Sequence, residues 1–242
     1  MTQGPSSRVQ TSYRVTEQTL VIDLGGKRRV LSSAPQGGGL ISASHILNHQ
    51  VESNPIANTQ QRSHGDPARA LRQLAASLGM QQRTVGLMTA VPMKQLVTAR
   101  VSSGSVWVEC FATVGVTNAV RAGERPETDS RRSQAAELGT INLIVVTNAC
   151  LSSAAMVGAV QVVTESKTGV LRDHAVPSWT GQPGATGTGT DAVVIACRLR
   201  GEGPVQAHSG THTMIGALIG EAVAECVTRG LAKAKQWQER HA

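Results

Sequence analysis

An apolar run of six residues, Ala192 to Cys197, constrains the fold of this chain more than any other feature. The run is short for a helix and has no polar face, so it predicts a strand that is covered on both faces. The preceding residues, 185–191, read Ala-Thr-Gly-Thr-Gly-Thr-Asp and cannot fill a core. Because glycine permits positive φ and close approach of the backbone, this loop is expected to be the floor of a binding site or, alternatively, a flexible surface loop.

The rest of the chain alternates between short β-branched segments and longer segments with helical periodicity. Gly25-Gly26 predicts a two-residue hairpin turn, and Asp66-Pro67 is typical of a helix start. Strands are expected at residues 19–24, 27–33, 83–90, 96–102, 106–115, 141–146 and 192–197, and helices at 67–79, 152–173 and 211–238. This order predicts an α/β (α+β layered) fold, a mixed β-sheet covered by helices.

A length of 242 residues suits a single domain with a substantial core. Residues 1–17 are rich in Gln, Ser and Thr and are expected to form a flexible tail, with one domain over 18–242. Residues 121–137 mix charged residues with proline and predict an exposed loop.

Composition narrows the partners and the compartment. Aromatic residues make up only 2% of the chain, and its basic residues are scattered despite a net charge of +7, so nucleic-acid binding is not expected. The four cysteines lie far apart in apolar contexts, which disfavours disulfides and zinc sites and suits a reducing compartment. With neither a secretory signal nor a membrane span in the sequence, we expect a cytoplasmic protein without membrane contact. A homo-oligomer is compatible with the sequence.

Lys167 is an anomaly in the predicted helix over 152–173. At 100° per residue it falls in the middle of the apolar stripe that contains Val163 and Val170, whereas Glu165 points the opposite way. A buried ammonium must be paired or line a cavity; the alternative is that the side chain reaches past the helix end into solvent. Asp191 is the best-placed carboxylate: it could act as a base toward water or hold a partner such as Lys167 or His212 in position, or it could simply cap a helix or tie down its own loop.

Two asparagines and a histidine complete the set of candidates. Asn118 and Asn148 occur in the repeated tetrapeptide Val-Thr-Asn-Ala at predicted strand ends, where they either converge on one crevice or only shape turns. His208 and His212 have i, i+4 spacing, but no third metal ligand is marked, so no metal site is expected. His212 is instead a candidate for proton transfer or an ordinary polar helix start. Nucleophile-elbow, phosphate-loop and zinc-protease motifs are absent from the sequence.

Several stretches, in this order, resemble the adenosylcobinamide amidohydrolase family. They are Leu31–Pro35 with Gly37–Gly39, Gly115–Ala119, Gly139–Leu143 with Thr147–Ala149, Thr164–Lys167, Ala185–Asp191, and Gly210–Thr213 with Ile219–Glu221. Together they span roughly residues 19–230. Ser166 stands where the family pattern suggests alanine, and Cys150 has no counterpart in that pattern, which argues against a cysteine nucleophile.

The resemblance implies hydrolysis of the amide between the aminopropanol arm and the corrin ring of adenosylcobinamide. No cofactor is implied, since cobalt enters only within the corrinoid substrate. The hypothesis is attack by water with Asp191 or Glu165 as base, His212 assisting the leaving amine, and Lys167 stabilising the oxyanion; a Thr188 or Thr190 nucleophile is the competing scheme. The candidate substrate-binding residues are Asn118, Asn148, Thr186, Thr188, Thr190, Gly187, Gly189 and Gly38. A corrinoid-binding protein without activity and a phosphate-ester hydrolase are the other hypotheses.

Overall fold

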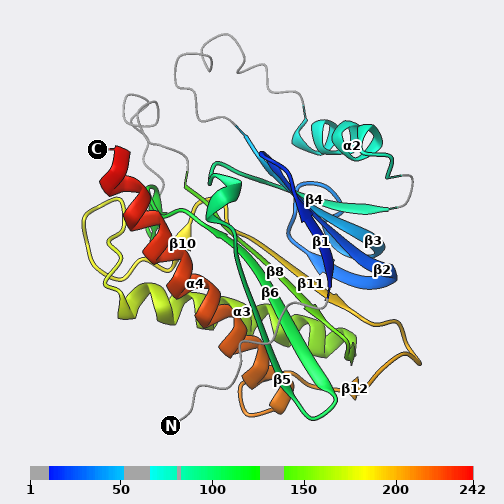
Figure 1. The fold of residues 1–242 in the computed structure, drawn as a ribbon. Coiled ribbons are helices and arrows are strands. Elements are labelled where there is room, and N and C mark those ends of the chain that lie inside the picture. The colour runs from blue at the N-terminus through cyan, green and yellow to red at the C-terminus, as the bar shows by residue number, and fades with distance from the viewer. Residues whose placement is uncertain (1–10, 52–65, 81–82, 126–138, 242) are drawn as a thin grey trace.

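The structure is a computed structural model that describes residues 11–51, 66–80, 83–125 and 139–241. Its main sheet has eight strands, namely β1 (Ser12–Val15), β2 (Thr19–Ser32), β3 (Gly39–Gln50), β4 (Thr84–Thr89), β5 (Val97–Ser103), β6 (Val106–Val114), β8 (Ile141–Thr147) and β11 (Ala192–Cys197). They are ordered β4-β3-β2-β11-β8-β6-β5, with β1 paired to β2 (Figure 1). β11 runs parallel to β8 but antiparallel to β2, which makes the sheet mixed, as predicted.

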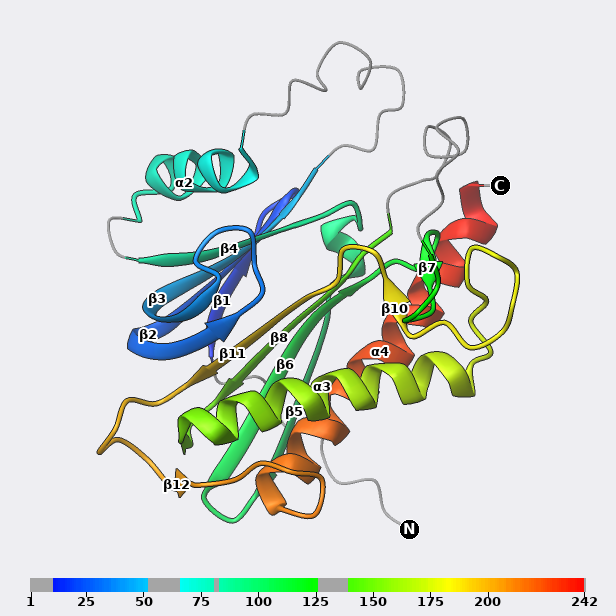
Figure 2. The ribbon, with the colours of Figure 1, turned by 180° about the vertical axis from the view of Figure 1, so that it is seen from behind.

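Helices α3 (Ser153–Asp173) and α4 (Met214–His241) pack side by side against β5, β6, β8 and β11, whereas α2 (Pro67–Ser77) packs near β3 and β4 (Figure 2). The main core lies between α3, α4 and the sheet. A second core fills the inside of the strongly curved sheet, between the strands of its two halves. This arrangement confirms the predicted mixed sheet covered by helices. Within the described ranges, no helix is long and apolar enough to cross a membrane.

Helix starts follow their sequence signals. Asp66 caps α2 by accepting a hydrogen bond from the Ala68 amide, and Ser152 caps α3 by accepting one from the Ala155 amide. Both side chains satisfy backbone N–H groups that have no partner inside the helix. The three predicted helices are therefore confirmed.

The predicted hairpin at Gly25-Gly26 is wrong. β2 continues through both glycines, and the residues on either side of them pair antiparallel with β3. The register between the strands shifts between Asp23 and Arg28, and the glycines take φ values of 67° and 124° there. The glycine pair therefore makes a bulge, because both flanks have the same partner strand.

Part of the predicted N-terminal tail forms a strand. Residues 1–10 and most of the predicted loop 121–137 lie outside the described residues, but Ser12–Val15 form β1 on β2. The Thr11 amide donates to the Glu109 carboxylate of β6 at 2.9 Å, and the Thr11 hydroxyl donates to the same oxygen. The prediction of a flexible tail over 1–17 therefore does not hold for residues 11–15.

Candidate active site

A buried ion pair joins α3 to the start of β11. Lys167 Nζ donates to Asp191 Oδ2, and the two side chains are only 9% and 12% exposed. Lys167 lies on the inward stripe of α3, as predicted, and is buried within the protein rather than reaching into solvent. Asp191, its partner, is held in place because it is the last loop residue before the central strand β11. Burial without a counter-ion would destabilise the protein by several kcal/mol, so the two charges depend on each other.

Two further donors hold the Asp191 carboxylate. Thr188 Oγ1 donates to Oδ1 at 2.5 Å, and the backbone amide of Ile141 donates to the same oxygen at 3.0 Å. The amide is in reach because β8 and β11 run parallel, with Asn142 opposite Ala192. A carboxylate with three donors is fixed in orientation. The arrangement directs the Thr188 hydroxyl proton toward a base, as activation of a hydroxyl nucleophile requires.

Gly187 lies directly against the ion pair. A Cβ atom at this position would lie 2.6 Å from Lys167 Nζ and would also collide with the Asp191 carboxylate. The loop glycines were expected to allow positive φ, but neither Gly187 nor Gly189 has it. Position 187 instead requires the absence of a side chain. Gly187 and Thr188 form β10 (Gly187–Thr188), which pairs with β7 (Ala119–Val120).

Backbone and hydroxyl groups of the threonine-rich loop are tied to the segment before β8. Thr140 Oγ1 donates to the Thr190 carbonyl at 3.0 Å, and Thr190 Oγ1 donates to the Gly139 carbonyl at 3.4 Å. Thr186 Oγ1 accepts a hydrogen bond from the Ala122 amide at 2.8 Å. The loop is therefore anchored on both sides of Thr188. Gly187 and Thr188 are buried, whereas the next two residues, Gly189 and Thr190, are exposed.

Asn118 lies at the same end of the sheet. A Cβ atom on Gly139 would be 2.6 Å from Asn118 Oδ1, which places the amide beside the segment that leads into β8. Among the described residues, Asn118 Oδ1 is a buried oxygen with no hydrogen-bond donor. A buried acceptor without a donor is costly and is found where a ligand or water supplies one. This supports the predicted role of Asn118 in binding, which remains a proposal.

Asn148 is not part of this site. It follows the C-terminal end of β8, whereas Asp191 contacts the N-terminal residue, so the length of the strand separates them by roughly 20 Å. Its side chain accepts from the Trp107 amide at 2.9 Å and donates to the Ser105 carbonyl at 2.7 Å. Asn148 therefore ties down the β5–β6 hairpin.

Three other predicted residues make no contact with the ion pair in the described part of the chain. His212 is exposed in the turn before α4, six residues beyond β12 (Val205–Gln206), which pairs with β9 (Cys150–Leu151). Glu165 is exposed on α3. Gly38 packs against the Ala34 carbonyl, from which its Cβ would be 2.8 Å away, in a loop that is hydrogen-bonded through Ser33 to Val193, two residues beyond Asp191. In the parts of the chain that the structure describes, no three His, Cys, Asp or Glu side chains are grouped so as to hold a metal ion.

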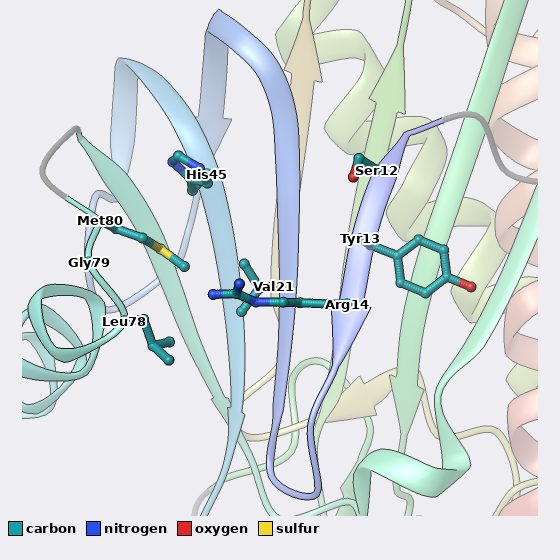
Figure 3. A pocket seen from close by; sticks show the side chains of 8 residues that line it. All are labelled: Ser12, Tyr13, Arg14, Val21, His45, Leu78, Gly79 and Met80. Carbon is teal, nitrogen blue, oxygen red and sulfur yellow. The ribbon is translucent and has the colours of Figure 1, made fainter.

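A hollow of about 400 Å³ lies elsewhere, between β1, β2, β3 and the end of α2 (Figure 3). Arg14 extends over Val21 toward Leu78, and the His45 ring lies nearby. None of these residues contributes to the site around Asp191. The hollow is therefore distinct from the candidate active site.

The fold and the site define a layered α/β protein with a buried lysine–aspartate–threonine cluster at one end of a mixed sheet. The sequence profile of the adenosylcobinamide amidohydrolase family matches residues 3–239, and the chain belongs to that family.

Relatives support this membership at moderate identity. An uncharacterized protein of Methanocaldococcus jannaschii is 28% identical over 89% of this chain and 86% of its own. An adenosylcobinamide amidohydrolase of Methanosarcina mazei is 29% identical over 90% of this chain and 96% of its own. Another, from Halobacterium salinarum, is 34% identical over 51% of this chain and 50% of its own.

Solved structures are more distant. A Burkholderia β-aminopeptidase has a TM-score of 0.39 with 12% identity and covers 90% of this chain and 78% of its own. An L-aminopeptidase D-Ala-esterase/amidase from Ochrobactrum anthropi has a TM-score of 0.42 with 10% identity and covers 96% and 82%. Both TM-scores lie below 0.5.

Proposed function

We propose that the protein hydrolyses the amide bond between the aminopropanol arm and the corrin ring of adenosylcobinamide, giving adenosylcobyric acid and 1-aminopropan-2-ol for cobamide salvage. Family membership supports the reaction class and the substrate. The observation that carries the proposal is the buried Asp191 carboxylate, which holds both a cation and a hydroxyl. Amide hydrolysis needs a base, a nucleophile and a positive group near the oxyanion, and these side chains supply all three.

The nucleophile is the Thr188 hydroxyl in this scheme. Its oxygen attacks the carbonyl carbon while its proton passes to Asp191, 2.5 Å away. The C–N bond then breaks as the nitrogen takes the proton from Asp191. The product 1-aminopropan-2-ol departs, and the corrinoid acyl group remains as an ester on Thr188. Water hydrolyses that ester, which releases adenosylcobyric acid and restores the hydroxyl.

Lys167 stabilises negative charge during this reaction. Its ammonium touches the base and lies beside the Gly187 backbone, where no side chain fits. A fixed cation at such a place is typically worth on the order of a hundredfold to a thousandfold in rate. Direct attack by a water molecule, with Asp191 as its base, uses the same residues and leaves Thr188 as a positioning group.

Product analysis tests the reaction. Purified protein is incubated with adenosylcobinamide, and adenosylcobyric acid and 1-aminopropan-2-ol are sought by mass spectrometry. Asp191→Asn and Lys167→Met should each lower the rate by on the order of a hundredfold or more. Thr164→Val, an exposed change on the same helix as Lys167, is the matched control and should keep the rate. Corrinoid binding without product would favour the inactive binding protein, and phosphate release from an ester would favour the phosphatase hypothesis.

Two substitutions separate the nucleophiles. Thr188→Val removes the hydroxyl and should abolish turnover, whereas Thr188→Ser should retain part of it. An acyl adduct on residue 188 of the serine variant would identify the covalent scheme. If Thr188→Val instead keeps much of the wild-type rate, water is the nucleophile and the threonine only orients Asp191.

A further inference from the structure

Aromatic rings are scarce in this chain, and four of the five have a ring or cation as a partner. Tyr13 and Phe111 contact each other with centroids 5.2 Å apart, Arg100 lies 5.5 Å from the Trp107 ring, and Lys94 lies 3.8 Å from the Trp237 ring. The fifth is Trp179, which is 39% exposed and has no such partner in the described part of the protein. An indole that contacts water and no other ring or cation is available to bind a ligand.

Trp179 lies beside the candidate active site. Its backbone amide donates to the Ala119 carbonyl of β7 at 2.7 Å. Ala119 is in turn the cross-strand partner of Thr188 in β10. Two successive strand spacings place the backbone of Trp179 roughly 10 Å from that of Thr188. Figure 2 shows the loop between α3 and β10, in yellow, next to β7.

Polar contacts fix the backbone on both sides of the indole. The Ser178 hydroxyl donates to Glu124 at 2.7 Å, and the Thr180 hydroxyl donates to the same carboxylate at 3.2 Å. The other oxygen of Glu124 accepts from the Arg121 amide at 2.8 Å. The Arg121 amide and then the Ser178 hydroxyl hold the pKa of Glu124 below its ordinary value. An exposed ring on an anchored backbone loses little freedom on binding, which favours affinity.

We propose that Trp179 stacks on a flat conjugated part of the substrate and thereby selects corrinoids. The inference rests on the proposed function, because the size and chemistry of the ligand come from it. Adenosylcobinamide has two such parts, the conjugated corrin ring and the adenine of its upper ligand. Either is large enough to reach Trp179 while the scissile amide lies at Thr188. The ring is thus a substrate-binding group that the predicted loop residues did not include.

Steady-state kinetics of Trp179→Ala test the proposal. The variant should raise KM for adenosylcobinamide roughly five- to a hundredfold, as loss of one stacked aromatic does, with a smaller change in kcat. Trp179→Phe should recover part of the affinity. Trp107→Phe, a matched loss of an indole near the opposite end of β8, should leave KM unchanged. Circular dichroism and the unfolding temperature establish that each variant is folded.

Fluorescence titration with adenosylcobinamide separates the two hypotheses. If the wild type binds but does not cleave, the proposed reaction fails, and weaker binding by Trp179→Ala still supports stacking. If the wild type cleaves and Trp179→Ala has the wild-type KM, stacking is refuted and the reaction stands. If the wild type neither binds nor cleaves, both are overturned. The same titration with cobinamide that lacks the adenosyl group identifies the stacked part. If Trp179→Ala still binds this ligand more weakly than the wild type, the corrin ring is stacked; if both bind it equally, adenine is.

Discussion

Replacing Lys167 by methionine should destabilise the protein more than any other single lysine change on α3 or α4. The side chain is 9% exposed, and its loss leaves the Asp191 carboxylate buried without a cation. Breaking a buried pair by removing one partner costs about 3–5 kcal/mol. Asp191 retains two donors, Thr188 and the Ile141 amide, so the expected loss of unfolding free energy is smaller than this range, about 2–3 kcal/mol.

Urea unfolding followed by circular dichroism measures this loss, and a fall in melting temperature of roughly 5–10 °C should accompany it. Lys235→Met, a change at an exposed position of α4, is the control and should stay within about 0.5 kcal/mol of the wild type. Adding Asp191→Asn to Lys167→Met should recover part of the stability, since the unpaired charge is removed. If Lys167→Met unfolds like the wild type, the two groups do not depend on each other, and the reasoning about the ion pair is refuted.

Three further outcomes are expected. Gly187→Ala should lower activity and melting temperature, because its methyl group collides with the ion pair. The expected loss of unfolding free energy is roughly 1–3 kcal/mol. An alanine variant with wild-type activity would contradict this. Hydrogen bonds lower the pKa of Glu124 in the folded protein. Their contribution to stability is therefore complete above the ordinary glutamate pKa and is lost as the pH falls through the lowered pKa. Trp179 emission should therefore shift as the pH falls below the ordinary glutamate pKa, and Glu124→Gln should abolish that shift. Glu109→Gln should speed tryptic cleavage after Arg14, because it weakens the bond that holds the N-terminal segment to β6; unchanged cleavage would show that β1 alone holds the segment.

The sequence indicated the ion pair as one of several alternatives because two local rules agreed. Helical periodicity placed Lys167 on the inward stripe, and the loop-to-strand boundary placed Asp191 at the end of a buried strand. Pairing then followed from the cost of burying either charge alone. Trp179 was missed because it lies in a loop without periodicity. The signal that could have found it was compositional, a tryptophan in a chain with few aromatic rings.

Features that depend on how strands pair were beyond the sequence. Asn118 and Asn148 share the same tetrapeptide, yet they lie near opposite ends of β8, because a repeated motif carries no information on strand direction. Strand β3 was not predicted at all, because polar side chains such as His45 and Asn48 break its apolar pattern. Asn48 is hydrogen-bonded by residues distant in sequence, Thr113 and Asn142. Gly25-Gly26 has the sequence of a hairpin, and only the shared partner β3 makes it a bulge.

The donors to Asp191 have a consequence for how the chain matures as it leaves the ribosome. Ile141, Lys167 and Thr188 all precede the aspartate, so these three hydrogen-bond donors to its carboxylate have been translated before Asp191 itself. The aspartate is therefore the last residue of this cluster to be synthesised. A circularly permuted version that begins at Asp191 would reverse that sequence of events, and its folding rate and yield would report how much the natural order matters.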